Sequence, residues 1–301
     1  MRLARDHPDE VVRGLHKSGR WERVGRGVYL PDSPTAGIDR RRRVALARIV
    51  GIHQRVQAEH WFSHESAALI WGLPLWRTPD TTHLRQVHRP GSGADPLITR
   101  HVGIPDPDQR RVVLGLPVTS LERTVLDCVA TVPPMRGLVI ADAALRIGAD
   151  RGALEDLLAG RAGRPGSARA RAILSLADDG AESPGESAAR FIVLRDGLPI
   201  PSTQVAVETR IGTFWADLGW PEWRLLLEYD GRAKYAGSEA ERFMQEKRRH
   251  DAVLETGHRI LRVTKEDLTT DALTRRLLQY APPTTRLRPR RELRTAHETR
   301  S

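Results

Sequence analysis

The sequence has little lysine and almost no cysteine. Only four of its 301 residues are lysines, so arginine carries nearly all of the basic charge behind the formal net charge of +10. The single cysteine, Cys128, excludes a disulfide within the chain and a zinc site built from several cysteines. No apolar run reaches the roughly 18–20 residues that a membrane-spanning helix needs. No apolar signal segment follows Met1. We therefore expect a cytoplasmic protein without a membrane partner.

The basic residues gather in three places, and this distribution favours a polyanion such as DNA as the partner. The first place is the opening thirty residues and the second is the start of a helix near residue 40. The third is the end of the chain, where residues 286–301 carry six arginines against two glutamates. We expect residues 282–301 to form a basic, disordered tail. The candidate nucleic-acid-binding residues are Arg20, Arg23, Arg26, Arg40, Arg41, Arg42 and Arg43.

The first thirty residues combine a short helix with a basic hairpin. Apolar residues at helical spacing predict a helix over Asp9–Ser18, which ends at Gly19. Apolar and polar residues then alternate over Trp21–Leu30, with glycines where a hairpin bends. This order is typical of the second half of a winged helix whose first helix is missing or very short. The alternative is a small capping hairpin. We assign residues 1–32 to a partial winged-helix-like module.

Residues 38–180 are predicted to be rich in helices and to lack a catalytic constellation. Helices are expected at 40–57, 63–71, 121–129, 136–147, 152–158 and 167–177, with strands at 82–88, 98–103 and 111–118. Thr119–Glu122 forms a capping box before the buried helix. His60 and His64 are four residues apart, but their neighbours do not complete a zinc-protease motif. We interpret them as a surface pair.

Residues 181–281 predict a second kind of domain, with the element order α-β-β-β-α-β-α. Ser183 followed by Pro184 and Glu186 indicates a helix N-terminus, and that helix ends at Gly197. Strands are expected at 203–208, 214–220 and 223–230, with a tight turn at Pro221-Glu222. A helix over 238–256, a strand over 258–264 and a helix over 270–280 complete the domain. The chain as a whole is therefore expected to be mixed α/β.

Three acidic residues lie on two neighbouring strands of this domain. Glu228 and Asp230 share a strand face because side chains alternate along a strand. The short turn places Asp217 about opposite Leu226 on the adjacent strand, on that same face. Such carboxylates repel one another unless a cation lies between them, and their oxygens suit Mg²⁺ or Mn²⁺. Glu186 could add a fourth oxygen, although capping alone also explains it, and the other acids could decorate an exposed sheet.

Glu186, Asp217 and Glu228–Gly231 on this frame resemble the PD-(D/E)XK nuclease superfamily. The closest likeness is to the branch beside the very-short-patch-repair (Vsr) mismatch endonucleases. The resemblance implies that Asp217 and Glu228 bind Mg²⁺. It also implies a water-activating lysine two residues after Glu228, but this chain has Asp230 there. Superfamily members also carry that lysine on a helix, so Lys247 is the candidate, with Lys234 as the alternative.

The first 180 residues resemble AbiEi-type antitoxins, which are winged-helix autoregulators of type IV toxin–antitoxin systems. The resemblance rests on Trp21–Leu30, on Phe62–Ala68 followed by Gly72-Leu73-Pro74, and on Pro117–Ser120 followed by Arg123–Asp127. It implies DNA as a partner and a cognate toxin as a further one.

Two functions follow from these patterns. The first is a Mg²⁺-dependent DNA endonuclease with Asp217, Glu228, Asp230 and Lys247 as its catalytic residues. The second is a non-catalytic antitoxin or transcriptional regulator that uses the nuclease-like fold for binding. The intact acidic cluster favours the first function, and the missing acid-x-lysine triplet favours the second.

Overall fold

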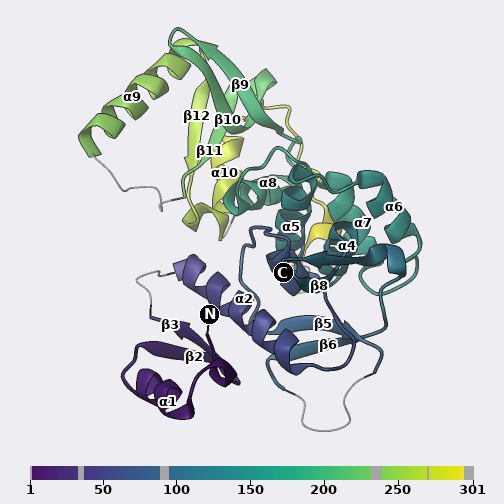
Figure 1. Ribbon diagram of the computed structural model, residues 1–301. Helices are drawn as coiled ribbons and strands as arrows, with labels where there is room; N and C mark the ends of the chain where they lie inside the picture. The colour runs from purple at the N-terminus through teal and green to yellow at the C-terminus, as the bar shows by residue number, and fades with distance from the viewer. Residues whose placement is uncertain (1, 33–36, 89–94, 232–238, 270, 295–301) are drawn as a thin grey trace. The chain divides into compact units, whose positions relative to one another are not determined.

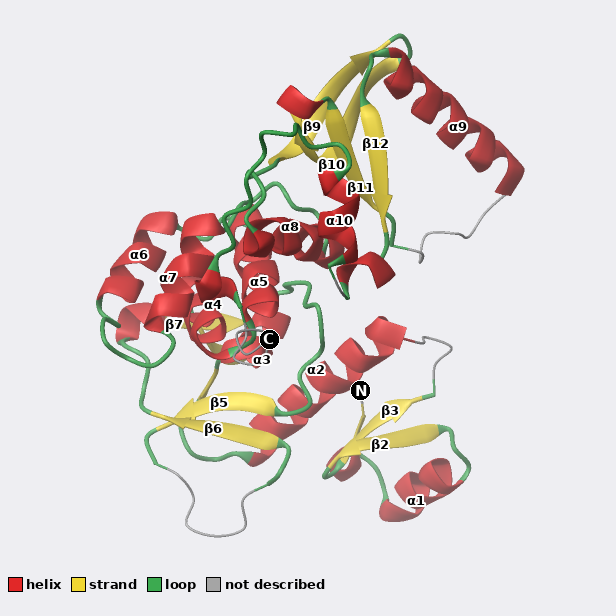
Figure 2. Cartoon of the chain, turned by 180° about the vertical axis from the view of Figure 1, so that it is seen from behind, coloured by secondary structure: helices red, strands yellow, loops and turns green. Residues whose placement is uncertain are grey.

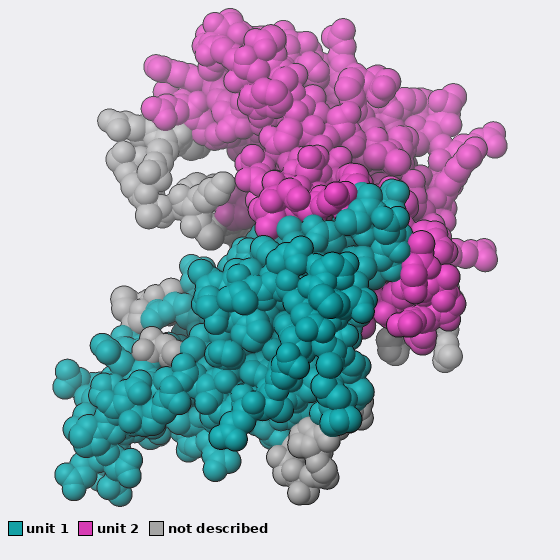
Figure 3. Space-filling model, turned by 45° about the vertical axis from the view of Figure 1, so that its right-hand side comes forward, with its two compact units in different colours: residues 1–128, 152–157 teal, residues 129–151, 158–301 magenta. Residues whose placement is uncertain are grey.

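The computed structural model describes residues 2–32, 37–88, 95–231, 239–269 and 271–294, and for residues 38 and 239–243 it describes the backbone alone. The chain divides into two compact units, which Figure 3 shows in different colours. Unit 1 is Met1–Cys128 with Gly152–Leu157, and unit 2 is Val129–Arg151 with Leu158–Ser301. This division differs from the predicted one, because residues 129–151 and 158–180 belong with the C-terminal part of the chain.

Both units mix helices and strands, so the fold is mixed α/β as predicted (Figure 1). Unit 1 contains β1 (Arg2–Leu3), α1 (Asp9–Lys17), β2 (Trp21–Gly25), β3 (Val28–Pro31), α2 (Gly37–Arg55), β4 (Trp61–Phe62), α3 (His64–Ile70), β5 (Thr82–Gln86), β6 (Ile98–Val102), β7 (Arg110–Val113) and β8 (Leu116–Thr119). Helices α4 (Leu121–Thr131) and α6 (Arg151–Ala159) contribute residues to both units. None of the helices within the described ranges is long and apolar enough to cross a membrane.

Unit 2 contains the remaining elements. They are α5 (Pro134–Arg146), α7 (Ser167–Leu176), α8 (Pro184–Asp196), β9 (Ser202–Thr209), β10 (Gly212–Trp220), β11 (Leu225–Tyr229), α9 (Glu239–Glu255), β12 (Arg259–Val263) and α10 (Ala272–Leu278). From α8 onward this is the predicted order α-β-β-β-α-β-α, which is confirmed. A short 3-10 turn, Pro221–Trp223, takes the place of the predicted tight turn between β10 and β11.

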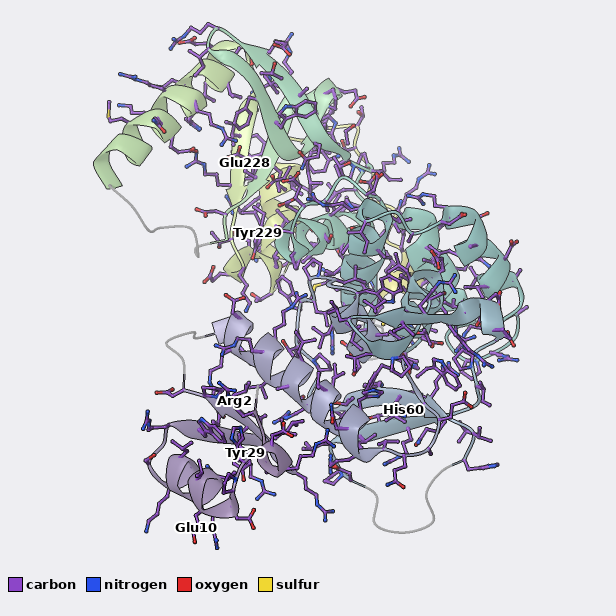
Figure 4. All side chains as sticks on the ribbon, viewed as in Figure 1. Arg2, Glu10, Tyr29, His60, Glu228 and Tyr229 are labelled. Carbon is purple, nitrogen blue, oxygen red and sulfur yellow. The ribbon has the colours of Figure 1, made fainter. Side chains whose placement is uncertain are left out.

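The N-terminal hairpin belongs to a three-stranded antiparallel sheet with the order β1-β3-β2. Strand β1, which was not predicted, pairs Arg2 with Tyr29 of β3; both residues are labelled in Figure 4. The buried core of this sheet joins Val24, Val28 and Leu30 to Ala47 of α2. Helix α2 therefore completes the core of the module that was expected to end at residue 32.

The rest of unit 1 contains a five-stranded sheet with the order β6-β5-β4-β8-β7. Three strands were predicted over this region. The run 111–118 is a hairpin of two strands, because Leu114 and Gly115 adopt φ values of 54° and 75° and turn the chain. Strand β4 has only two residues, which is too short for an alternation pattern to appear.

The sheet of unit 2 has the order β12-β11-β10-β9. Strands β9, β10 and β11 are antiparallel, whereas β11 and β12 are parallel and are joined through α9. Helix α9 contacts β9 and β12, and α8 contacts β10 and β11. Figures 1 and 2 show α8 and α9 at opposite sides of this sheet. Helix α8 therefore packs on strands β10 and β11.

A buried ion pair fastens α8 to α5. Arg190 donates from Nη2 to Oδ1 of Asp142 across 2.6 Å, and its Nη1 donates to the carbonyl of Leu176. The main-chain N–H of Asp178 also donates to Asp142. Both side chains of the pair are almost fully buried, with 2% and 0% exposed. Because an unpaired buried charge is very costly, this contact is a strong constraint on the packing of α8.

The predicted disordered tail is in part an ordered segment of unit 2. The main-chain N–H of Arg288 donates to the carbonyl of Gly197, and that of Arg290 donates to the carbonyl of Arg195. Leu293 is only 2% exposed. Arg288 and Arg290 are therefore fixed to the end of α8, and residues 291–293 contact α7, so the expectation of disorder is wrong for residues 288–293. The rest of the tail lies outside the described residues.

Candidate functional site

The N-terminus of α8 positions the first acidic residue of the predicted site. Ser183 caps the helix and accepts a hydrogen bond from the N–H of Glu186 across 3.2 Å. The carboxylate of Glu186 in turn accepts the N–H of Glu182 at 2.6 Å. This arrangement is close to the capping box that the sequence left open as an alternative for Glu186, but Glu186 accepts from the residue before the cap and not from Ser183 itself.

Close packing then brings Glu186 beside the sheet. A Cβ added to Gly185 would lie 1.9 Å from Cε1 of Tyr229, so only glycine allows α8 to approach β11 this closely. Glu186 is buried, with 8% of the residue exposed. Burial raises the pKa of Glu186 above its ordinary value, and the neighbouring negative charge of Asp217 raises it further. The two carboxylates are therefore close enough to repel each other.

Asp217 lies on β10 at the point where the pairing with β11 ends. The last paired residues are Leu218 and Leu227, and Leu226 lies opposite Gly219 rather than opposite Asp217 as predicted. The carboxylate of Asp217 accepts the main-chain N–H of Tyr229 at 2.7 Å. Its side chain thus bends toward the backbone of β11 and extends the ladder of hydrogen bonds between the two strands.

Glu228 is half-buried on β11 and is held by two arginines that sequence reasoning did not single out. Arg249 of α9 donates to Oε1 at 3.1 Å, and Nε of Arg262 lies 3.7 Å from Oε2. Burial is the largest influence on Glu228 and raises its pKa above the ordinary value. The two arginines oppose that rise, whereas the charges of Glu246 and Asp230 add to it.

The side of α9 that faces the sheet differs from the predicted one. Arg249 lies over the ring of Phe214, with its guanidinium carbon 3.4 Å from the ring centroid. Val253, one turn later, is fully buried. Lys247 is exposed, so the expectation that it leans toward Glu228 is wrong. The side chain of Phe243, which gave that expectation, and all of Lys234 lie outside what the structure describes.

The predicted convergence of Asp217, Glu228 and Asp230 on one cation is also wrong. Among the described residues, these acids do not form a group of three whose ligand atoms all lie within 4.8 Å. Asp217 turns to the Tyr229 backbone while Glu228 turns to Arg249. Asp230 is half-buried, and its N–H donates to Val263 of β12. Asp217 and Glu228 are therefore held by different partners.

The predicted nucleic-acid-binding residues fall into an exposed set and a partly engaged set. Arg20, Arg23, Arg26 and Arg41 are exposed, with Arg23 and Arg26 on and beside the hairpin of β2 and β3. Arg40 is also exposed, but it forms an ion pair with Glu22. Arg42 donates to the carbonyl of Leu73, and Arg43 is half-buried. The exposed set is therefore the part best placed to contact phosphates.

Unit 1 contains a polar cluster that the sequence analysis missed. Asp127 is almost fully buried and accepts hydrogen bonds from Arg85 of β5 and Arg123 of α4. Next to it, His64 stacks on His101 with ring centroids 3.8 Å apart. Arg123 and Asp127 are four residues apart on a helix that is otherwise largely apolar, and this spacing was the available signal.

The interpretation of His60 and His64 as a surface pair is wrong, because both residues are buried. His60, which Figure 4 labels, instead contacts His53: Nε2 of His60 lies 3.1 Å from Nδ1 of His53. The two histidines contact different partners.

Comparison with known proteins identifies two relatives. They are the uncharacterised proteins MT2308 and Rv2248 of Mycobacterium tuberculosis, from strains CDC 1551 / Oshkosh and ATCC 25618 / H37Rv. Each is 28% identical to this chain over 256 residues, which cover 84% of this chain and 88% of the relative. The crystal structure of the Rv2827c protein from the same species aligns with 67% of this chain and 76% of its own, at 19% identity and a TM-score of 0.35. No model of a known protein family matches the chain.

Proposed function

We propose that this chain is a DNA-binding protein whose residues 181–281 form a Mg²⁺- or Mn²⁺-dependent endonuclease domain of the PD-(D/E)XK type. The observation that carries the proposal is the pair of Glu186 and Asp217. These carboxylates come from different elements, and their repulsion contributes to the raised pKa of Glu186. A cation between them would remove that repulsion. The element order from α8 to α10 and the parallel pairing of β11 with β12 agree with this fold type.

The oxygen donors at this place fit a hard divalent cation. Glu186 and Asp217 would hold it, whereas Glu228 on the adjacent strand turns to Arg249 instead. When bound, the cation would neutralise charge on a phosphodiester and favour ionisation of an attacking water. Arg249 supplies a fixed positive charge beside Glu228 where the resemblance implied a lysine. An arginine there can stabilise developing phosphate charge, but it does not serve as a base.

Unit 1 supplies the DNA-binding part of the proposal. Helix α1 followed by the hairpin of β2 and β3 is the arrangement of a winged helix, and β1 adds the third strand of its sheet. Arg23 and Arg26 project from the hairpin and are exposed. Arginines in such a position bind the phosphate backbone, which positions a protein on DNA without reading its sequence.

Cleavage of supercoiled plasmid tests the endonuclease proposal. Purified full-length protein is incubated with plasmid and either Mg²⁺, Mn²⁺ or EDTA, and nicked and linear products are quantified. We expect metal-dependent nicking that Asp217→Asn abolishes, while Lys247→Ala, at an exposed position, cleaves like the wild type. A wild type that never nicks the plasmid with either metal rejects the endonuclease.

A second candidate function is the non-catalytic regulator of antitoxin type. The ion pairs of Glu228 with Arg249 and Arg262 favour it, because a carboxylate held by two guanidinium groups is less free to bind a metal. In this case the wild type binds DNA, including the region upstream of its own gene, and leaves it intact in Mg²⁺ and Mn²⁺. The same plasmid experiment, paired with a binding assay, separates the two functions.

A further inference from the structure

Three histidines from separate segments of unit 1 meet at one place. Each of His64, His83 and His101 offers a ring nitrogen, and these three atoms all lie within 4.8 Å of one another. Nδ1 of His83 is 3.0 Å from Nε2 of His101. Neutral imidazole nitrogens are the ligands that Zn²⁺ and the neighbouring transition metals prefer.

The sheet of unit 1 sets the positions of two of these rings. Strands β5 and β6 are parallel, with His83 opposite Thr99 and Arg85 opposite His101. Residues two apart on a strand share a face, so the two histidines lie on the same side of adjacent strands. The sheet therefore holds both rings on one face, with His101 opposite the residue two positions after His83.

Helix α3 brings the third ring to that surface. His64 is the first residue of α3, which packs on β5 and β8. Its φ of 52° lies in the left-handed region that favours glycine, yet a histidine occupies the position. Such strain persists only where the surrounding structure holds the residue in place. The side chain of His64 is thus held at the sheet although its backbone conformation is unfavourable for a histidine.

The surroundings of His64 fix its ring in place. The residue is buried. Nδ1 of His64 lies 2.9 Å from Oγ of Ser63 and 3.9 Å from Oδ2 of Asp127. A carboxylate near the second nitrogen of a histidine is the usual support of a metal ligand, because it fixes the ring and raises its basicity.

We propose that His64, His83 and His101 form a Zn²⁺-binding site in unit 1, separate from the carboxylates of unit 2. His83 and His101 are half-exposed, so a fourth coordination position is accessible to water. His64 and His101 are stacked with 13° between their planes, and nitrogen lone pairs lie in the ring plane. One of these rings must therefore tilt when the metal binds, and His101 is the more exposed of the two.

The positive charge of nearby side chains weakens the binding of Zn²⁺ at this site but does not prevent it. Arg85 and Arg123 both contact Asp127, whose carboxylate offsets part of their charge. The group of Asp127, Arg85 and Arg123 carries a formal charge of about +1, a repulsion that three nitrogen ligands must outweigh. Mg²⁺, which prefers oxygen ligands, should not compete for this site.

Direct metal titration tests the proposal without any assay of DNA. Full-length protein is stripped with a chelator, dialysed, and titrated with ZnCl₂ in a calorimeter, and bound zinc is then counted by elemental analysis. We expect one Zn²⁺ per chain, with binding weakened more than about 100-fold in His83→Ala and in His101→Ala, since loss of a ligand should exceed the effect of losing an outer partner. The control is His53→Ala, because His53 and His60 form a two-histidine contact in the same unit.

A second measurement, made on the wild type, tests the proposal even if the histidine variants fail to fold. In wild-type protein labelled with ¹⁵N-histidine, Zn²⁺ should shift the ring nitrogens of three histidines together and leave those of His258 unchanged. The proposal is overturned if the wild type binds no Zn²⁺. It is also overturned if His83→Ala and His101→Ala, shown to be folded by circular dichroism, bind it as tightly as the wild type does. Loss of binding in His53→Ala alone would place the metal at the other histidine pair.

Discussion

Arg249 donates a hydrogen bond from Nη2 to Oε1 of Glu228 across 3.1 Å. The same guanidinium lies over the ring of Phe214, so one side chain ties α9 to two strands of the sheet. Lys247 is exposed on the same helix. Arg249, and not Lys247, is therefore the residue that joins this helix to the sheet.

Substitution of these two residues should give different results. Arg249→Ala should lower the free energy of unfolding by about 1–3 kcal/mol, because half-buried Glu228 loses a charged partner and Phe214 loses its cover. Lys247→Ala should stay within about 0.5 kcal/mol of the wild type. Chemical denaturation followed by circular dichroism measures both. Equal losses in the two variants would show that α9 presents a different side to the sheet.

The buried pair of Asp142 and Arg190 should be among the most sensitive positions of unit 2. Asp142→Ala leaves the Arg190 guanidinium buried without its carboxylate and should cost about 3–5 kcal/mol. Asp271→Ala is the matched control, since its ion pair with Arg275 is exposed and should be worth about 0.2–0.5 kcal/mol. Urea unfolding compares the two. A small loss for Asp142→Ala would mean that this pair does not fasten α8 to α5.

Asp196 should make stability depend on pH. Burial alone would raise its pKa, but hydrogen bonds from Arg195 and Thr274 outweigh burial and hold the pKa below its ordinary value. A lowered pKa in the folded state stabilises the fold at neutral pH, and this contribution is lost as the pH falls through the folded pKa. Asp196→Asn should therefore be less stable than the wild type at neutral pH, and the difference should close in acid. A difference in urea midpoint that stays constant with pH would contradict this.

The effect of truncating the basic tail on stability should depend on the residue at which the chain is cut. Removal of residues 286–301 exposes the surface beneath Leu293 and should cost about 1.5–3 kcal/mol from that side chain alone. Removal of residues 295–301 keeps Leu293 and the main-chain contacts of Arg288 and Arg290, and it should leave the melting temperature unchanged. Thermal melts of the two truncated chains test this, and an equal melting temperature would mean that the segment packs only loosely.

The sequence allowed prediction of those elements whose patterns are local. The helix at α1, the hairpin after it and the whole order from α8 to α10 follow from spacing, caps and alternation. Strands β1 and β4 have two residues each and carry no pattern. The ordered segment around Leu293 was missed because arginines dominate its composition, while one leucine and its backbone contacts hold it in place.

The candidate site was predictable in its residues but not in its contacts. Glu186, Asp217 and Glu228 do lie on α8, β10 and β11, but register and rotamer decide which of them meet. The phase of α9 could not be read from one aromatic residue, and an error of one position replaces an inward side chain with an exposed one. The three histidines are separated by 19 and 18 residues, so only the tertiary fold brings them together.

Binding to DNA is the claim that both candidate functions share, and the salt dependence of binding tests it most directly. Fluorescence anisotropy with labelled duplex DNA in EDTA gives the affinity at several salt concentrations. Each arginine–phosphate contact adds about 0.9 to the steepness of the plot of log affinity against log salt. The double variant Arg23→Ala with Arg26→Ala should lower that slope by about 2, whereas Arg275→Ala in unit 2 should leave it unchanged. Absence of binding at low salt, or an affinity equal at low and high salt, would contradict the account.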